Sequence, residues 1–205
     1  MRGLNKNTRA ALIISECQRG VIERELSAFS GLVDQVEERG IVSKIASLAV
    51  EFRRMSQTVV HAHVAHNKGY PDLPMTNVIV ARTAKMGGML VGSDDVDPVA
   101  ELQPHQGDVV HERSFSLVAF NGTDFDSLLR HRGITTLILA GVSSNIAIPG
   151  MAVCAADLGY QVIVAEDCIA GASAETHDFS IKNTLPLFAN VASSAEIIQA
   201  LSAQI

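Results

Sequence analysis

The sequence predicts a three-layer α/β/α fold, in which helices cover both faces of a six-stranded, mainly parallel sheet. Three observations support this prediction: short apolar runs recur along the chain, segments with helical spacing lie between them, and the composition is uniform throughout the 205 residues. Alternating strands and helices are typical of parallel sheets covered on both faces. A chain of this length with 47% hydrophobic residues can bury one substantial core. We therefore expect a single domain over residues 1–205.

The six predicted strands are continuous apolar runs, as expected for strands that are buried on both faces of a sheet. They are 11–15 (ALIIS), 58–64 (TVVHAHV), 107–110 (GDVV), 135–142 (TTLILAGV), 160–166 (YQVIVAE) and 190–194 (NVASS).

Four predicted helices have apolar residues three and four positions apart. These residues are Ile41, Ile45, Leu48, Ala49 and Phe52; then Phe125, Leu128 and Leu129; then the run 148–158; and finally Ile197, Ile198 and Leu201. Thr123 is a suitable N-cap for the second of these helices, and Gly133 lies just past its end. Gly159 similarly ends the third helix.

The charge and composition exclude several classes of partner. A formal net charge of −6 with 4% aromatic residues provides neither a basic surface for phosphates nor rings for base stacking. The polar N-terminus leads into an apolar run far shorter than the ~20 residues of a membrane span. Cys17, Cys154 and Cys168 have neither zinc-site spacing nor the density of a disulfide scaffold. We expect a cytoplasmic protein that binds neither nucleic acid nor membrane.

Polar residues gather just after the predicted strands. In an open parallel sheet, ligands bind beyond the carboxyl ends of the strands, where the strand order reverses. The residues at these ends are Ser15, Glu16, Cys17 and Gln18; His61, His63 and His66; His111, Glu112 and Arg113; Ser143, Ser144 and Asn145; and Glu166, Asp167 and Cys168.

Three segments occur in a familiar order: ALIISECQ, DVVHERSFSLVAFNGTDFDSLLR and GVSSNIAIPGMAVCAADLGYQVIVAEDCIAG. Together they resemble the isochorismatase-like hydrolases, often called cysteine hydrolases, which include nicotinamidases and N-carbamoyl amide amidohydrolases. The resemblance covers nearly the whole chain and implies a sheet order of 3-2-1-4-5-6. In that family an aspartate, a lysine and a cysteine form the site, and these positions correspond here to Glu16, Arg113 and Ala147. The chain thus looks like a member that lacks the nucleophilic cysteine.

Each of the three changes has a chemical consequence. Glu16 keeps a carboxylate that can act as a general acid or base. Arg113 keeps the positive charge, but its planar, permanently protonated group is better suited to binding an anion or carbonyl than to relaying protons. Ala147 has no nucleophilic atom, so covalent catalysis cannot start there.

The resemblance also implies a role for the backbone of the turn before residue 147. The family has a cis peptide at the position of Val142 and Ser143, and the N–H groups of Ser143 and Ala147 correspond to its oxyanion hole, which needs no side chain. A helix that begins at Ala147 adds a modest preference for negative charge.

Five other side chains could in principle replace the nucleophile. Cys154 lies two helical turns beyond Ala147 and is expected in the core, and Cys17 is expected to point away from Glu16. Cys168 is expected in a loop near the site. The hydroxyls of Ser143 and Ser144 are more typical of turn hydrogen bonds, unless a base reaches one of them. The sequence leaves Ser143, Ser144 and Cys168 open.

Five residues are candidates for binding a substrate: Arg82, His63, His111, Ser144 and Asn145. Arg82 can clamp a carboxylate from the loop between the second and third strands. The run HAHVAH suggests a metal cluster, but it lacks the Asp-x-His spacing that the resemblance requires. We expect no metal and no cofactor.

Two segments fit an interaction better than catalysis. Residues 19–40 form an insertion that suits a lid or a subunit contact, and residues 85–92 (KMGGMLVG) are glycine-rich and apolar. Relatives are commonly dimers or tetramers, so we expect a homo-oligomer.

The favoured function is a hydrolase of the isochorismatase family that acts on a small acidic or carbonyl-bearing metabolite without cysteine covalent catalysis. Glu16 serves as acid or base, although a neighbouring arginine stabilises the ionised carboxylate and so favours a base. Two alternatives remain: an inactive ligand-binding or regulatory homologue, and a subunit that assembles with itself or an active relative.

Overall fold

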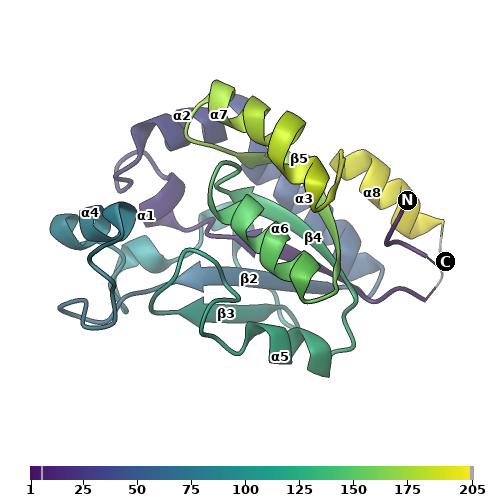
Figure 1. The fold of residues 1–205 in the computed structure, drawn as a ribbon, viewed down its shortest axis with the longest axis horizontal. Coiled ribbons are helices and arrows are strands. Elements are labelled where there is room, and N and C mark those ends of the chain that lie inside the picture. The colour runs from purple at the N-terminus through teal and green to yellow at the C-terminus, as the bar shows by residue number, and fades with distance from the viewer. Residues whose placement is uncertain (6, 204–205) are drawn as a thin grey trace.

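The computed structural model describes residues 1–5 and 7–203, and at its centre lies a six-stranded parallel sheet (Figure 1). Its order is β3-β2-β1-β4-β5-β6, with all neighbours parallel. The strands are β1 (Ala10–Ser15), β2 (Thr58–Val64), β3 (Val109–Arg113), β4 (Thr136–Val142), β5 (Gln161–Ala170) and β6 (Asn190–Ala192). The predicted fold class and strand order are confirmed. Because the order reverses between β1 and β4, their carboxyl ends open a crevice.

Helices cover both faces of this sheet. On one face lie α2 (Ser30–Arg39), α3 (Ile41–Arg54) and α8 (Ser194–Ser202), and on the other lie α5 (Phe125–His131) and α6 (Ala147–Asp157). The remaining helices are α1 (Arg19–Ile22), α4 (Val78–Met86), α7 (Ala174–Phe179), and the short turns η1 (Asp94–Val96), η2 (Ala100–Leu102), η3 (Ser180–Thr184) and η4 (Leu185–Leu187). Among the described residues, no helix has the length and apolar character needed to cross a membrane.

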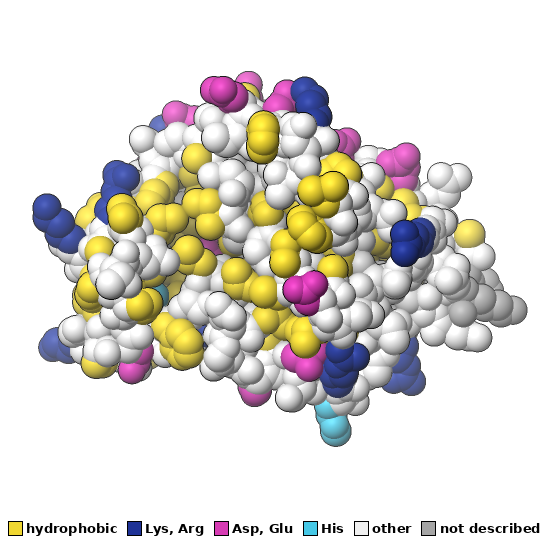
Figure 2. All heavy atoms as spheres, viewed as in Figure 1, with side chains coloured by type: hydrophobic (Ala, Val, Ile, Leu, Met, Phe, Trp, Pro, Cys, Tyr) yellow, Lys and Arg dark blue, Asp and Glu magenta, His cyan; other side chains and the backbone are white. Residues whose placement is uncertain are grey.

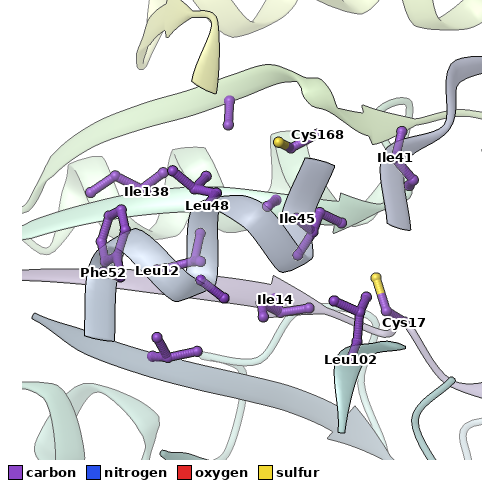
Figure 3. Close-up of a cluster of buried hydrophobic side chains, with 14 of the residues drawn as sticks. Leu12, Ile14, Cys17, Ile41, Ile45, Leu48, Phe52, Leu102, Ile138 and Cys168 are labelled. Carbon is purple, nitrogen blue, oxygen red and sulfur yellow. The ribbon is translucent and has the colours of Figure 1, made fainter. Parts of the chain in front are cut away.

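The sheet separates two apolar cores because successive side chains of a strand point to opposite faces. Leu12 and Ile14 of β1 pack with α3, whose Phe52 is fully buried (Figure 3). Ala11 and Ile13 belong to the other core, which includes buried residues of α5 and α6. Both faces of β1 are therefore buried, which explains its uninterrupted apolar sequence.

The third strand was predicted two to three residues too early, at 107–110. It runs over Val109–Arg113, at the edge of the sheet, where β2 is its neighbour. Val110 and Glu112 are exposed there, so the strand alternates between buried and exposed residues. Because the prediction relied on a continuous apolar run, it missed the carboxyl end of this alternating strand.

The fifth strand continues past the polar pair that was taken as its end. The register of β5 against β4 shifts between Leu139 and Gly141, and β5 extends to Ala170. The carboxylate of Asp167 accepts hydrogen bonds from the backbone N–H and the hydroxyl of Ser194, at 2.7 and 2.6 Å. Cys168 is consequently a fully buried strand residue, and the prediction that it lies in a loop near the site is wrong.

Two further boundaries differ from the sequence prediction. Asp124, rather than Thr123, is the N-cap of α5, although the Thr123 hydroxyl accepts a hydrogen bond from the Phe125 N–H at 3.2 Å. Arg82, predicted in a loop, lies within α4. Gly133 and Gly159 have left-handed φ values of 67° and 88° just past their helices, as predicted.

Candidate active site

Glu16 is held at the carboxyl end of β1 by an unusual backbone conformation. Its φ is 51°, in the left-handed region that costs energy for a residue with a side chain, and its N–H donates to the carbonyl of Ala62 at 3.0 Å. Such conformations persist where the surrounding structure fixes them, often at functional sites. The side chain is 15% exposed, so its carboxylate remains accessible.

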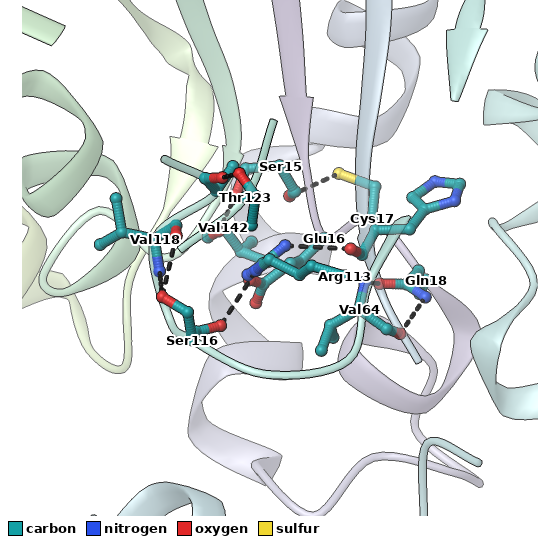
Figure 4. Close-up of polar contacts among 12 residues, drawn as sticks. Ser15, Glu16, Cys17, Gln18, Val64, Arg113, Ser116, Val118, Thr123 and Val142 are labelled. Carbon is teal, nitrogen blue, oxygen red and sulfur yellow. Dashed lines mark hydrogen bonds and ion pairs between the residues drawn. The ribbon is translucent and has the colours of Figure 1, made fainter. Parts of the chain in front are cut away.

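Arg113 holds this carboxylate in place. Its guanidinium donates to the Glu16 Oε1 atom, to the His63 carbonyl at 3.0 Å and to the Ser116 carbonyl at 2.9 Å (Figure 4). The Arg113 side chain is only 2% exposed and does not line the cavity described below. Arg113 therefore fixes Glu16, and the direct binding of a ligand expected from the sequence finds no support in this position. The other Glu16 oxygen, Oε2, forms no hydrogen bond with the described residues.

The turn between β4 and α6 presents backbone N–H groups to the same region. The peptide between Val142 and Ser143 is cis, as the resemblance implied. The N–H groups of Ser144, Ile146 and Ile148 donate to carbonyls within the fold. Those of Ser143 and Ala147 donate to no described residue. Two donors are thus left for a ligand at the start of α6.

Close packing of β1 against β4 brings this turn beside Glu16. Gly141 has a φ of 97°, and a Cβ atom there would lie 2.3 Å from the Ser15 carbonyl oxygen. The Ser15 hydroxyl donates to the Val142 carbonyl at 2.8 Å. Glycine is required at residue 141 because the two backbones meet there without room for a side chain.

A cavity of about 290 Å³ joins these elements. Glu16, Ser143, Asn145 and Ala147 line it from the crevice, and Arg82 lines it from α4. The Arg82 guanidinium donates to the Ala28 carbonyl at 3.0 Å and lies 5.3 Å from the centre of the Phe29 ring. The rest of the lining is mostly apolar: Val21, Ala28, Phe29, Ser30, Gly31, Leu32, Ile79, Leu117, Val142, Ile146 and Ala172. The cavity lies on the face shown in Figure 2, where apolar side chains gather between α4 and α6.

Of the five predicted binding residues, Arg82 and Asn145 line this cavity. His63 is buried in the sheet with its ring 5.8 Å from that of His61, and burial lowers its pKa to about 4, helped by the nearby charges of His61 and Arg113. The His111 ring contacts Asp124 at 3.1 Å, and burial lowers its pKa.

Ser144 is also removed from the cavity. It is completely buried, and its hydroxyl lies 3.0 Å from the Nδ1 atom of His177. Burial lowers the pKa of His177, the nearby Arg39 adding to the shift. This pair ties the turn after β4 to α7, and its serine has no path to a ligand in the cavity.

The cysteines lie away from the cavity. Cys17 and Cys168 belong to the apolar core, where burial raises the pKa of both thiols, that of Cys168 to about 12. The Cys17 thiol approaches the Ser15 carbonyl at 3.6 Å, away from Glu16 as predicted. Cys154 is half-buried within α6. Of the residues left open as nucleophiles, only Ser143 lines the cavity in the described part of the chain.

Several lining residues carried no sequence signal. Ile79 comes from a segment with no recognisable motif, and Leu117 was not singled out although it lies within the segment DVVHERSFSLVAFNGTDFDSLLR. The one available signal was the insertion 19–40, whose residues 28–32 form one wall of the cavity. Within residues 1–5 and 7–203, no group of three or more His, Cys, Asp or Glu residues is arranged to hold a metal ion.

Comparison with known proteins agrees with this architecture. The isochorismatase domain family matches residues 10–196 of the chain. The chain belongs to the isochorismatase family. It is 32% identical over 202 residues to the uncharacterized isochorismatase family protein YecD of Escherichia coli O157:H7, with 98% of this chain and 100% of the relative covered.

Two further similar proteins are hydrolases. Maleamate amidohydrolase of Pseudomonas putida is 25% identical over 160 residues, covering 78% of this chain and 74% of the relative. A cysteine hydrolase from Pseudomonas syringae superimposes with a TM-score of 0.85 at 20% identity, covering 96% of this chain and 94% of that one. The chain thus has an isochorismatase-family hydrolase fold, and its relatives include amidohydrolases.

Proposed function

We propose that this protein hydrolyses a small acidic or carbonyl-bearing metabolite by direct addition of water, without a covalent cysteine intermediate. The observation that carries the proposal is the shared cavity, where the carboxylate of Glu16 meets the free N–H groups of Ser143 and Ala147. Residue 147, which corresponds to the family's nucleophile, offers a methyl group to this cavity.

Glu16 acts as a general base in this mechanism. Its Oε1 atom is bound by Arg113, which leaves Oε2 to accept a proton from a water molecule. Because the guanidinium binds Oε1 and leaves Oε2 free, the carboxylate can take a proton from water without breaking its contact with Arg113. Activation of water is therefore the first step of the proposed mechanism.

The N–H groups of Ser143 and Ala147 stabilise the negative charge that develops on the substrate oxygen. For an amide, the water oxygen bonds to the carbonyl carbon, the C–N bond then breaks, and Glu16 returns its proton to the leaving nitrogen. The products are a carboxylic acid and ammonia or an amine. The dipole of α6 contributes less than about 1 kcal/mol to the stabilisation of the oxyanion.

Arg113 is a positioning residue in this scheme, and Arg82 takes the role of binding an anion. The Arg82 guanidinium donates one hydrogen bond to the Ala28 carbonyl. Its other N–H groups can pair with a ligand carboxylate. Maleamate, the compound in the name of one relative, combines a carboxylate with an amide and is a suitable first probe.

The test measures ammonia released from maleamate and a panel of small amides. Glu16→Gln is expected to lower kcat/KM by about 100-fold or more, because general base catalysis contributes factors of this order. Glu112→Gln, an exposed strand residue outside the cavity, is the matched control and is expected to retain activity. Full turnover by Glu16→Gln would show the mechanism to be wrong.

A second measurement separates water addition from serine catalysis. Intact-mass spectra taken during a single turnover are expected to contain no acyl adduct, and Ser143→Ala is expected to retain turnover. An adduct on Ser143 would replace the proposed mechanism with a covalent one.

The absence of a nucleophilic side chain at residue 147 also fits the alternative function, an inactive ligand-binding homologue. Thermal stabilisation by members of the panel, without release of product from any of them, would establish that function in place of hydrolysis.

A further inference from the structure

A second cavity of about 340 Å³ adjoins the first. Six residues line both: Glu16, Val21, Ala28, Phe29, Ile79 and Leu117. The shared wall is apolar except for Glu16. Each cavity alone is at or near the lower end of the ~300–1,000 Å³ range of small-molecule pockets. Together they form one cleft with two compartments.

The two compartments differ in charge. The first contains Arg82 and the free N–H groups of the turn, which suit a carboxylate or carbonyl oxygen. The second is lined by the carboxylates of Glu16, Glu25 and Asp95, and its lining contains no lysine or arginine. Glu25 is exposed and forms no ion pair with a described residue. Because the Glu16 carboxylate is paired with Arg113, the unpaired negative charge of the second compartment comes from Glu25 and Asp95.

His66 adds a hydrogen-bond acceptor to the second compartment. Its Nδ1 atom lies 2.7 Å from the Ser114 carbonyl oxygen, which only accepts, so Nδ1 carries the hydrogen. In the neutral ring, Nε2 then has a free lone pair. No described residue bonds to Nε2, although His66 as a residue is only 6% exposed and lines the cavity. The backbone of His66 is fixed by bonds with Met89 and Val91.

Asp95 orders the loop around the second compartment. Its carboxylate accepts hydrogen bonds from the Met89 N–H at 2.6 Å and from the Ser93 hydroxyl. Both donors are neutral groups of the loop, and no described lysine or arginine forms an ion pair with this carboxylate. A cationic group on a ligand would do so.

We propose that the two compartments bind opposite ends of one ligand, with the amide or carboxylate end at Ser143 and Ala147 and a protonated amine beside His66, Asp95 and Glu25. The apolar shared wall accommodates a short hydrocarbon chain between them. This inference rests on the proposed function for the placement of the carbonyl end, and it identifies the substrate class as ω-amino amides, whose hydrolysis yields ω-amino acids.

The test compares three amides of equal chain length: 6-aminohexanamide, hexanamide and adipamate, whose far ends are cationic, neutral and anionic. By calorimetry, 6-aminohexanamide is expected to bind about tenfold more tightly than hexanamide, the value of one partly solvated charge-assisted contact. Adipamate has a carboxylate that can pair with Arg82 in the first compartment, and Glu25→Gln is expected not to weaken its binding. Equal affinities of 6-aminohexanamide and hexanamide would overturn the proposal.

Variants locate the cationic end. Glu25→Gln is expected to weaken 6-aminohexanamide about threefold, and Glu25→Gln with Asp95→Asn about tenfold, while hexanamide binding stays unchanged. His66→Asn keeps a donor for the Ser114 carbonyl but removes Nε2, and it is expected to weaken the cationic amide alone. Glu112→Gln is the control. Unchanged selectivity in all three cavity variants would contradict the assignment.

The experiments distinguish failure of the two-compartment binding proposal from failure of the proposed hydrolase activity. If 6-aminohexanamide binds selectively but no amide is hydrolysed, the charge assignment stands and the proposed hydrolase activity fails. If maleamate or hexanamide is hydrolysed and the three far ends are not distinguished, the hydrolase stands and the two-compartment assignment fails.

Discussion

Replacing Arg113 by methionine tests the foundation of the site, because it removes the charge of Arg113 while retaining much of its apolar stem. The variant leaves the Glu16 carboxylate and the carbonyls of His63 and Ser116 without their guanidinium donors. Breaking one side of a buried ion pair costs about 3–5 kcal/mol. Since Glu16 is 15% exposed and can be partly hydrated in the cavity, we expect the lower end, about 3 kcal/mol.

The measurement is urea unfolding followed by circular dichroism. Arg54→Met is the matched control: its ion pair with Glu51 is exposed, and the expected change lies within about 0.5 kcal/mol. Combining Arg113→Met with Glu16→Gln removes the unpaired charge and is expected to recover about 1 kcal/mol or more. A loss below about 1 kcal/mol for Arg113→Met, or no recovery in the double variant, would refute the reasoning.

Three further predictions follow from individual positions. Ala147→Cys places a thiol in the cavity at the start of α6, so iodoacetamide should label residue 147 faster than Cys17 or Cys168, and labelling no faster than in the parent protein would contradict that orientation. The pKa of His63 is lowered from 6.5 to about 4, so the unfolded chain binds this proton more tightly. Stability should therefore fall as the pH drops from about 6.5 to about 4, and His63→Gln should reduce the slope by up to one proton, about 1.4 kcal/mol per pH unit; an unchanged slope would exclude this contribution. Gly141→Ala should cost about 3 kcal/mol or more in urea unfolding, because its Cβ overlaps the Ser15 backbone, whereas Gly159→Ala, with open space around it, should cost about 1 kcal/mol; equal losses would show that conformation alone matters.

Local patterns in the sequence predicted the fold and part of the site. Mainly apolar runs placed β1, β2 and β4 to within a residue at either end, since strands buried on both faces contain few polar residues, among them His61 and His63 of β2. The edge strand β3 escaped this rule because solvent reaches two of its residues. The polar residues after β1 and β4 pointed correctly to the crevice, since parallel strands bring their carboxyl ends to one edge.

The tertiary structure decided what each of these residues does. Glu16 and Arg113 are 97 positions apart, and the sequence could suggest their pairing, but only the packing directs Arg113 beneath Glu16 and away from the cavity. Likewise His63 and His111 lie within β2 and β3 and Ser144 follows β4, and all three side chains are buried in the sheet or beneath the turn.

By itself, the sequence determined the α/β/α class, the family, the carboxylate at residue 16 and the alanine at residue 147. Only the tertiary structure decided that two cavities of different charge meet at Glu16, because their walls come from α4, residues 28–32 and the loops near Ser93 and Leu117. Apolar periodicity reflects which side of one element faces the core. It carries no information about which distant loops converge over the ends of the strands, and these loops form the walls of the cleft.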